Sequence, residues 1–437
     1  MKKLVSLLLA TLLVLCLCGT ALAYSPEDPI TIEFWHNRGS GAQLTTVQGQ
    51  VDAFNETVGK EKGIIVKEVY IGGYADCMTK LQLSAASGEQ PVVSIVGNTR
   101  ISILADDDLL ENMLPYAQAS GVDISNFYYG MINVPYNDDT QICSFPYIKS
   151  TPVFYYNKTI AEEKGIVVPD HPTIADVEEI CKKAYTVNEN GEVEIWGLES
   201  LNDFTYYQGA FLWQLGEELW NEEGKSPALK GTSMLKVLSD WRRWVDEGWC
   251  RPFDSTSASD TMQQMFYQGK IFAFWASCAS MKNIEKYTLE AGYELGIACL
   301  PTYDPEKPIV PIGGDNIGLV KQGNTEEQKQ AGWEFINFLL TDEQVAYNSI
   351  NSGYLPTTYS VGNNEIMAEY WAANPLYKVA YDQLPNGIEQ AWPDFEYNSA
   401  LKTDIQSVVS LLIQERSITP EEAVQQIIDN NAYMDLL

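Results

Sequence analysis

The stretch from Tyr147 to Lys158 constrains the fold more than any other part of the chain. It begins with a polar turn that Pro152 restricts, continues as a short aromatic strand through Tyr156, and stops at Asn157 before a helical pattern. This order is typical of a strand that carries a chain from one α/β unit into another. We therefore expect a hinge here, between two separately folded halves.

The length of the chain allows two such halves. Residues 1–23 carry a charged start, a short apolar core and an Ala-Leu-Ala end, which is the pattern of a secretory signal peptide. Removing them leaves 437 − 23 = 414 residues, more than one typical domain contains. Cys16 and Cys18 allow a lipid anchor, but a bulky Leu precedes each, so we favour free release as a secreted protein.

Strand and helix patterns alternate on both sides of the predicted hinge. Residues 30–36 alternate like a strand and lead into helical spacing, and similar units follow over residues 64–96 and, after the hinge, around 271–275. Alternating β and α elements favour largely parallel sheets covered by helices. Three prolines within residues 300–308 suit a rigid return crossing, and a helix start predicts a third crossing near residue 342.

The net charge of −31 bears on the choice of partner. Loss of Lys2 and Lys3 with the signal peptide gives −31 − 2 = −33 for the secreted form. A field of this sign repels nucleic acid and anionic lipid and slows the encounter with anionic ligands. We expect a neutral or cationic ligand and no nucleic-acid partner, although acidity also simply keeps an exported protein soluble.

The sequence offers little for catalysis, cofactors or metals. Its histidines are His36 and His171, and the cysteines beyond the signal segment show no Cys-x-x-Cys spacing, so we predict no metal site. A P-loop is absent, and Gly39-Ser40-Gly41 lacks the third glycine of a dinucleotide loop, so we predict no cofactor. A secreted glycoside hydrolase stays an alternative, because the separation of two catalytic carboxyl groups cannot be read from a sequence.

Aromatic residues give the positive signal for a ligand. The chain carries 11 Trp and 25 Tyr, and rings with a polar edge suit sugars, whose C–H faces stack while their hydroxyls form hydrogen bonds. Tyr206, Trp213 and Trp275 are candidates in the second half, although rings at such positions serve equally well as core.

Six short motifs, taken in order, resemble those of the extracellular solute-binding proteins that feed ABC importers. The similarity is greatest to the glycerol-3-phosphate-binding branch and extends to the maltose-binding type. The motifs are Phe34-Trp35-His36, Ser150-Thr151-Pro152, Tyr267-Gln268-Gly269-Lys270, Ala276-Ser277-Cys278-Ala279-Ser280, Ile312-Gly313-Gly314 and Gly353-Tyr354-Leu355-Pro356.

The resemblance implies an α/β, two-lobe periplasmic-binding-protein-like fold with a hinge of three chain crossings. Lobe 1 is expected to comprise residues 24–149 with 303–341, and lobe 2 residues 150–302 with 342–437. It further implies an extracytoplasmic, monomeric protein without catalytic activity. Such a protein captures a small molecule by hinge closure and delivers it to the transmembrane subunits of an ABC permease.

The resemblance also implies which residues face the ligand. By this likeness they are Tyr74, Ser150, Ser277 or Ser280, Gly314 and Tyr354, and we add Asn37 and Asp315 beside them. Other interpretations stay open for three of these positions. Tyr74 also fits packing beneath a loop, Ser277 also fits a helix cap, and Asp315 also fits the closing of a turn.

Two departures from the glycerol-phosphate branch favour a carbohydrate, expected to be a small oligosaccharide. Asn98 stands where that branch places a glutamate for the glycerol hydroxyls, and Thr403 stands where it places a phosphate-holding arginine. Charge-assisted pairing with phosphate is then missing unless Lys402 supplies it. Glycerol 3-phosphate or glycerophosphocholine is the second candidate ligand, because a choline head group suits the acidic field.

Overall fold

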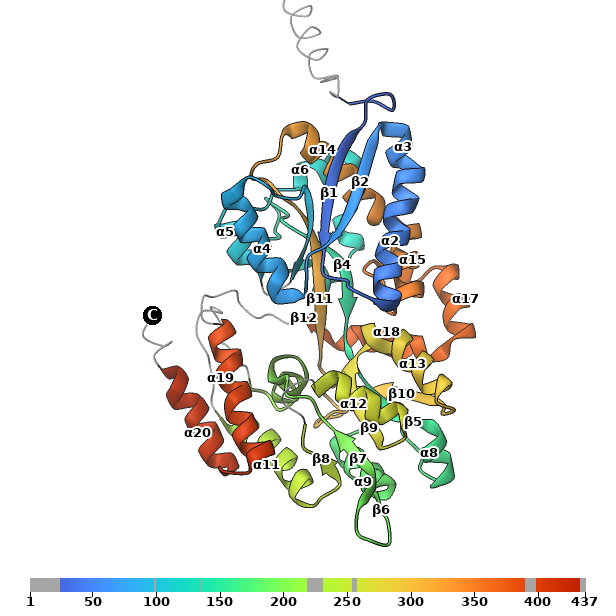
Figure 1. The fold of residues 1–437 in the computed structure, drawn as a ribbon, viewed down its shortest axis with the longest axis vertical. Coiled ribbons are helices and arrows are strands. Elements are labelled where there is room, and N and C mark those ends of the chain that lie inside the picture. Colours follow the sequence, from blue (N-terminus) through green and yellow to red (C-terminus); the bar gives the residue numbers. More distant parts are fainter. Residues whose placement is uncertain are drawn as a thin grey trace, which may run out of the picture.

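The chain is organised around two six-stranded sheets (Figure 1). The computed structural model describes residues 24–97, 100–134, 136–217, 231–253, 258–389 and 398–432. The predicted signal peptide, residues 1–23, lies outside them. Within these ranges no helix is long and apolar enough to cross a membrane.

The sheet of lobe 1 has both parallel and antiparallel neighbours. Strand β1 runs parallel to β2 and β3, whereas β11 runs antiparallel to β3 and β4. The strand order is β12 (Gly387–Glu389), β11 (Val310–Leu319), β3 (Val93–Gly97), β1 (Ile30–His36) and β2 (Ile64–Tyr70), with β4 (Phe145–Ser150) beside β11. Helices α2 (Gly41–Glu56), α14 (Glu326–Leu339) and α15 (Asp342–Ser352) lie on the opposite side of this sheet from α4 (Tyr74–Ser87) and α5 (Ile101–Asp106) (Figure 1).

The sheet of lobe 2 is also mixed. Strand β7 runs parallel to β8 and β9, and β5 runs antiparallel to β9 and β10. The order is β10 (Leu295–Cys299), β5 (Pro152–Asn157), β9 (Ile271–Ser277), β7 (Val193–Glu199) and β6 (Thr186–Val187), with β8 (Cys250–Arg251) beside β7. The helices around it include α9 (Ile174–Ala184), α11 (Thr232–Asp246), α12 (Ala258–Tyr267), α13 (Met281–Glu290), α19 (Asn398–Ser410) and α20 (Pro420–Asn431).

The chain passes between the sheets where the sequence predicts a hinge. Strand β4 ends at Ser150 in the first sheet, and β5 begins at Pro152 in the second. The chain returns between Cys299, which ends β10, and Val310, which begins β11. The two-lobe α/β fold is therefore confirmed, while the residue boundaries of the lobes stay a prediction.

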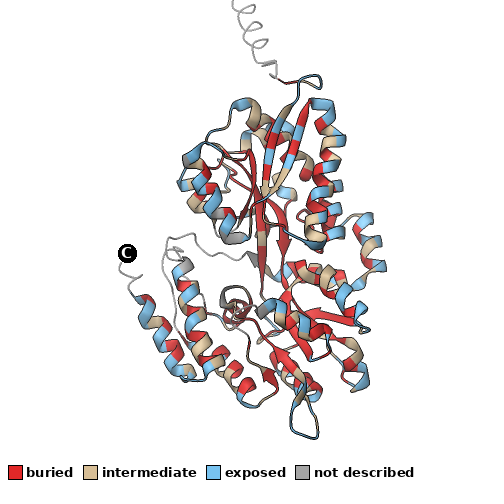
Figure 2. Cartoon of the chain, viewed as in Figure 1, coloured by how far each residue is buried: buried red, intermediate tan, exposed pale blue. Residues whose placement is uncertain are grey.

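Each lobe has its own apolar core (Figure 2). Strand β9 is buried from Ile271 to Ala276 because β5 and β7 flank it and helices cover it, so it is a continuous apolar run. Strand β1 instead alternates buried and exposed residues, because part of one face meets water. Capping boxes at Thr173 and Thr325 begin α9 and α14.

Candidate functional site

A buried ion pair joins the end of β1 to the hinge strand β11. The Arg38 guanidinium donates from Nη2 to Asp315 Oδ2 at 2.5 Å, and Asn37 Nδ2 donates to the same oxygen at 3.1 Å. Arg38 Nη1 donates to Tyr354 Oη at 2.6 Å and to Gln43 Oε1 at 3.2 Å. We call Asn37, Arg38, Gln43, Asp315 and Tyr354 the Arg38 cluster. Arg38 is 5% exposed and Asp315 is 0% exposed, so the pair is held away from water.

The Arg38 cluster also reaches lobe 2. Gln43, in the first turn of α2, donates from Nε2 to the carbonyl oxygen of Ala279 at 2.9 Å. A second contact joins Ser150, at the end of β4, to Tyr206 of lobe 2, whose hydroxyl groups are 3.3 Å apart. The lobes therefore meet through polar side chains beside the hinge, where a ligand that contacts both of them would sit.

Gly314 shapes the strand that carries Asp315. Its φ of +101° is a conformation that side-chain-bearing residues avoid, and a Cβ atom there would lie 2.0 Å from the carbonyl oxygen of Ile148. The pairing of β11 with β4 shifts register directly afterwards, between Asp315 and Asn316. Such a bulge re-aims the side chains beside it, so the glycine and the bulge together set where Asp315 points.

Burial has the largest effect on the pKa of Asp315. It raises the pKa of the carboxyl group above its usual value, while the positive charges of Arg38 and Lys149 oppose the rise. Asp315 Oδ1 and Asn37 Oδ1 are buried and accept no hydrogen bond from the residues that the structure describes. A Cβ atom on Gly97, at the end of β3, would lie 3.5 Å from Asp315 Oδ1. These two oxygens therefore have acceptor capacity that the described residues leave unused.

His36 links the backbone of Arg38 to the side chain of Glu68. Its Nε2 lies 2.6 Å from Glu68 Oε2, and its Nδ1 accepts from the Arg38 backbone N–H at 3.2 Å. The acceptor role of Nδ1 fixes a neutral imidazole with its proton on Nε2, donated to Glu68. Burial lowers the pKa of His36, although the bond to Glu68 opposes this. Burial raises the pKa of Glu68, but hydrogen bonds from Gln48 and His36 outweigh it and leave that pKa lowered.

We expect the free energy of unfolding to fall as the pH is lowered from 7 to 5. The His36 pKa is lower in the folded than in the unfolded protein, so the unfolded chain binds the proton more readily. The contribution of His36 is therefore complete above its unfolded pKa of about 6.5 and is lost as the pH falls below it. Glu68 acts in the same direction at lower pH.

The variant His36→Gln tests this. The substitution should lower the free energy of unfolding by about 1–2 kcal/mol at pH 7. It should also make that free energy less dependent on pH between 7 and 5, as measured by denaturant unfolding across that range. The solvent-exposed His171→Gln is the matched control and should keep the wild-type slope. Equal slopes for His36→Gln and the wild type would contradict the assignment.

The structure places the sequence-predicted site residues in three settings. Asn37, Ser150, Tyr206, Gly314, Asp315 and Tyr354 gather where the lobes meet. Trp275 belongs to the core of lobe 2, where it is 1% exposed and packs edge to face on Phe211, and Trp213 is buried as well. Asn98 and the side chain of Tyr74 lie outside the described residues.

The remaining sequence candidates have other roles, although Ser277 also contacts Tyr206 by a side-chain hydrogen bond. Ser277 Oγ accepts from the Ala279 backbone N–H at 3.2 Å, which is the capping role that the sequence left open. Thr403 is exposed on α19, and Lys402 pairs with Asp203 at 3.3 Å. Sequence reasoning missed Arg38 and Gln43. A charged residue two positions after the end of a strand was the available signal for Arg38.

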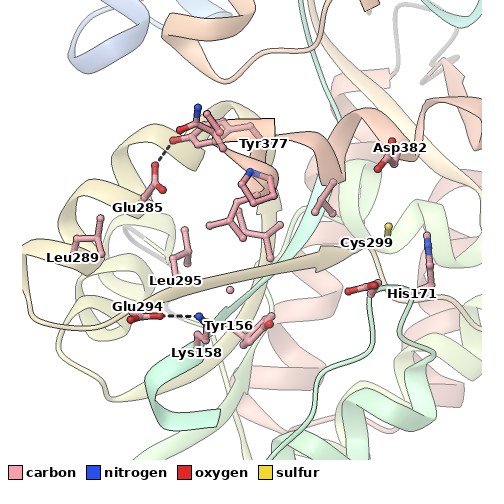
Figure 3. A pocket seen from close by; sticks show the side chains of 18 residues that line it. Tyr156, Lys158, His171, Glu285, Leu289, Glu294, Leu295, Cys299, Tyr377 and Asp382 are labelled. Carbon is pink, nitrogen blue, oxygen red and sulfur yellow. Dashed lines mark hydrogen bonds and ion pairs between the residues drawn. The ribbon is translucent and has the colours of Figure 1, made fainter. Parts of the chain in front are cut away.

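A pocket of about 760 Å³ lies along strand β10 of lobe 2 (Figure 3). Tyr156, Leu295 and Ile297 form part of its apolar lining. Its charged groups are largely satisfied from within. Lys158 Nζ donates to Glu294 at 2.8 Å, and Glu285 accepts from the Tyr377 hydroxyl. This pocket involves one lobe alone, so a molecule bound there would not draw the lobes together.

Comparisons with known proteins agree with this architecture. The sequence model of the bacterial extracellular solute-binding protein family matches residues 49–378. The sn-glycerol-3-phosphate-binding periplasmic protein UgpB of Rhizobium meliloti is 23% identical over 364 residues, 81% of each chain. UgpB of Escherichia coli K12 is 23% identical over 434 residues, 94% of each chain.

Solved structures show the same fold. The GacH receptor of Streptomyces glaucescens, studied unliganded and with acarbose, superposes with a TM-score of 0.77 at 18% identity, covering 92% of this chain and 98% of that one. UgpB of Mycobacterium tuberculosis in complex with glycerophosphocholine superposes with a TM-score of 0.78 at 20% identity, covering 93% and 98%.

Proposed function

Because this chain belongs to the bacterial extracellular solute-binding protein family, we propose that it captures an uncharged carbohydrate between its lobes and delivers it to an ABC permease. The coarser statement, that it is the solute-binding component of an ABC importer, follows from the family itself. The ligand class rests on the interlobe site. We further propose export through the signal peptide of residues 1–23, with release outside the cytoplasm favoured over a lipid anchor.

The observation that carries the proposal is the pair of buried acceptors in the Arg38 cluster. Asn37 Oδ1 and Asp315 Oδ1 accept no hydrogen bond from the described residues. A buried acceptor without a donor costs about 1–3 kcal/mol, so a ligand that supplies donors gains affinity there. Sugar hydroxyl groups are such donors, and the hydroxyl groups of Ser150 and Tyr206 lie between the lobes to meet others.

Binding is expected to favour the closed arrangement of the lobes. A molecule bonded both to the Arg38 cluster and to Tyr206 contacts lobe 1 and lobe 2 together. Tyr206 packs so closely on the hinge strand that a Cβ on Gly313 would lie 2.6 Å from its ring. Differential affinity for the closed form then shifts the population towards it, and the permease responds to that form.

Glycerophosphocholine is the second candidate, favoured by one relative and by the charge of the chain. The Mycobacterium tuberculosis structure contains this ligand, and a net charge of −31 suits a choline head group. Thr403 is exposed and carries no charge, and Lys402 already pairs with Asp203, so neither residue provides a strong contact for the phosphate group. We therefore rank glycerophosphocholine below a carbohydrate.

A thermal unfolding screen against sugars, glycerol 3-phosphate and glycerophosphocholine tests the proposal. A ligand at about 100 times its Kd adds about 2.7 kcal/mol to the free energy of unfolding, and X-ray scattering should show a smaller radius of gyration. The variant Tyr206→Phe should weaken sugar binding about fivefold or more by calorimetry, whereas the exposed Tyr287→Phe should not. Stabilisation by phosphate compounds alone, with none by any sugar, would contradict a carbohydrate ligand.

A further inference from the structure

The charge of Arg38 is compensated inside the protein before any ligand arrives. Its guanidinium is 5% exposed and lies 2.5 Å from the fully buried carboxylate of Asp315. Lys149, on the neighbouring strand β4, is also fully buried, and its charge acts on Asp315 as well. The Asp315 carboxyl group therefore lies beside one buried cation and within the electrostatic reach of a second, at the point where the lobes meet.

We propose that Asp315 is the residue that sets the charge selectivity of the interlobe site. This inference rests on the proposed function, because it names the ligand class of the same site. While Asp315 is ionised, it fills the place beside Arg38 that the phosphate of a ligand would take. The site then rejects phosphate monoesters and accepts hydroxyl groups. Without that charge, the same site would bind a phosphate monoester.

The hydrogen bonds of Arg38 are consistent with a site in which Arg38 could bind an anion and Asp315 excludes it. Arg38 can offer an anion two donors from one planar group, which is the arrangement that recognises carboxylates and phosphates. Asp315 occupies Nη2, while Nη1 donates to the neutral oxygens of Tyr354 and Gln43. A dianion approaching the pair would meet the negative charge of Asp315 in a poorly screened environment, where like charges repel strongly.

The variant Asp315→Asn tests the proposal, since it keeps the shape of the side chain and removes its charge. Binding of glycerol 3-phosphate and of inorganic phosphate is measured by calorimetry on the full chain. We expect the affinity for glycerol 3-phosphate to rise at least about tenfold over the wild type, as a charge-assisted bond to Arg38 replaces the one to Asp315. The matched control is the double variant Arg38→Gln with Asp315→Asn, which lacks both charges. It should show little of the increased affinity for glycerol 3-phosphate.

Folding of the variant is itself informative. Loss of the Asp315 charge removes a buried counter-ion of Arg38 and destabilises the fold, so Asp315→Asn should melt higher in phosphate than in a chloride buffer of equal ionic strength, and the wild type should not. Asp315→Ser serves as the second variant if the asparagine variant does not fold. A folded variant with no gain for either anion would overturn the proposal, as would a wild type stabilised more by glycerol 3-phosphate than by any sugar.

The same measurements separate this inference from the carbohydrate proposal. A wild type that binds no sugar, together with a variant that gains glycerol 3-phosphate, would refute the carbohydrate ligand and support the role of Asp315. If instead the wild type closes on a sugar, and the folded Asp315→Asn variant gains no affinity for glycerol 3-phosphate, the carbohydrate ligand is supported and the role of Asp315 is refuted.

Discussion

Replacing Gly314 by alanine is expected to lower the free energy of unfolding by about 3–5 kcal/mol, more than any other single methyl group added in the hinge. The residue has a φ of +101°, and the new Cβ would lie 2.0 Å from the carbonyl oxygen of Ile148. Strands β4 and β11 would have to separate, because a backbone atom cannot rotate away as a side chain does. Denaturant unfolding of variant and wild type measures the loss.

The matched control is Gly191→Ala. Gly191 also has a positive φ, +82°, but a Cβ there meets nothing within 4 Å. It should cost only the backbone strain, about 1–2 kcal/mol. The difference between the two variants isolates the clash in the hinge, and equal losses would show that Gly314 adapts. Gly314→Ala should also weaken ligand binding, because it displaces the adjacent Asp315.

Local patterns account for what the sequence could predict. The crossing at Ser150 could be read because a proline, an aromatic strand and a helix start follow one another within a dozen residues. The mixed character of the sheets could not, because β11 joins β3 and β4 from far along the chain, and periodicity says nothing about strand direction.

The site was harder to predict for a physical reason. Asp315 stands out beside Gly314, but its partner Arg38 lies 277 residues earlier, and one sequence does not show which distant charges meet. Trp275 illustrates the opposite problem. A ring at a strand end suits a sugar or a core equally well, and the packing of Phe211 against it became visible only in three dimensions.

Arg251→Met is expected to lower the free energy of unfolding by about 3 kcal/mol. Arg251 Nη1 donates at 2.7 Å to Glu199, which is 0% exposed at the end of β7. The methionine fills a similar volume but leaves a buried carboxylate without this counter-ion. Lys378→Met is the matched control, because its pair with Asp382 is about half exposed. It should change stability by less than about 0.5 kcal/mol.

The pH dependence of Arg251→Met separates lost charge compensation from lost packing. Without Arg251, the buried Glu199 side chain loses a counter-ion, and burial favours a neutral carboxyl group over a carboxylate. The folded variant then binds a proton more readily than the folded wild type does, so acidification favours its folded state relative to the wild type. The deficit of the variant should therefore shrink between pH 7 and pH 5. A deficit that stays constant over this range would instead assign the loss to packing around the aliphatic part of Arg251.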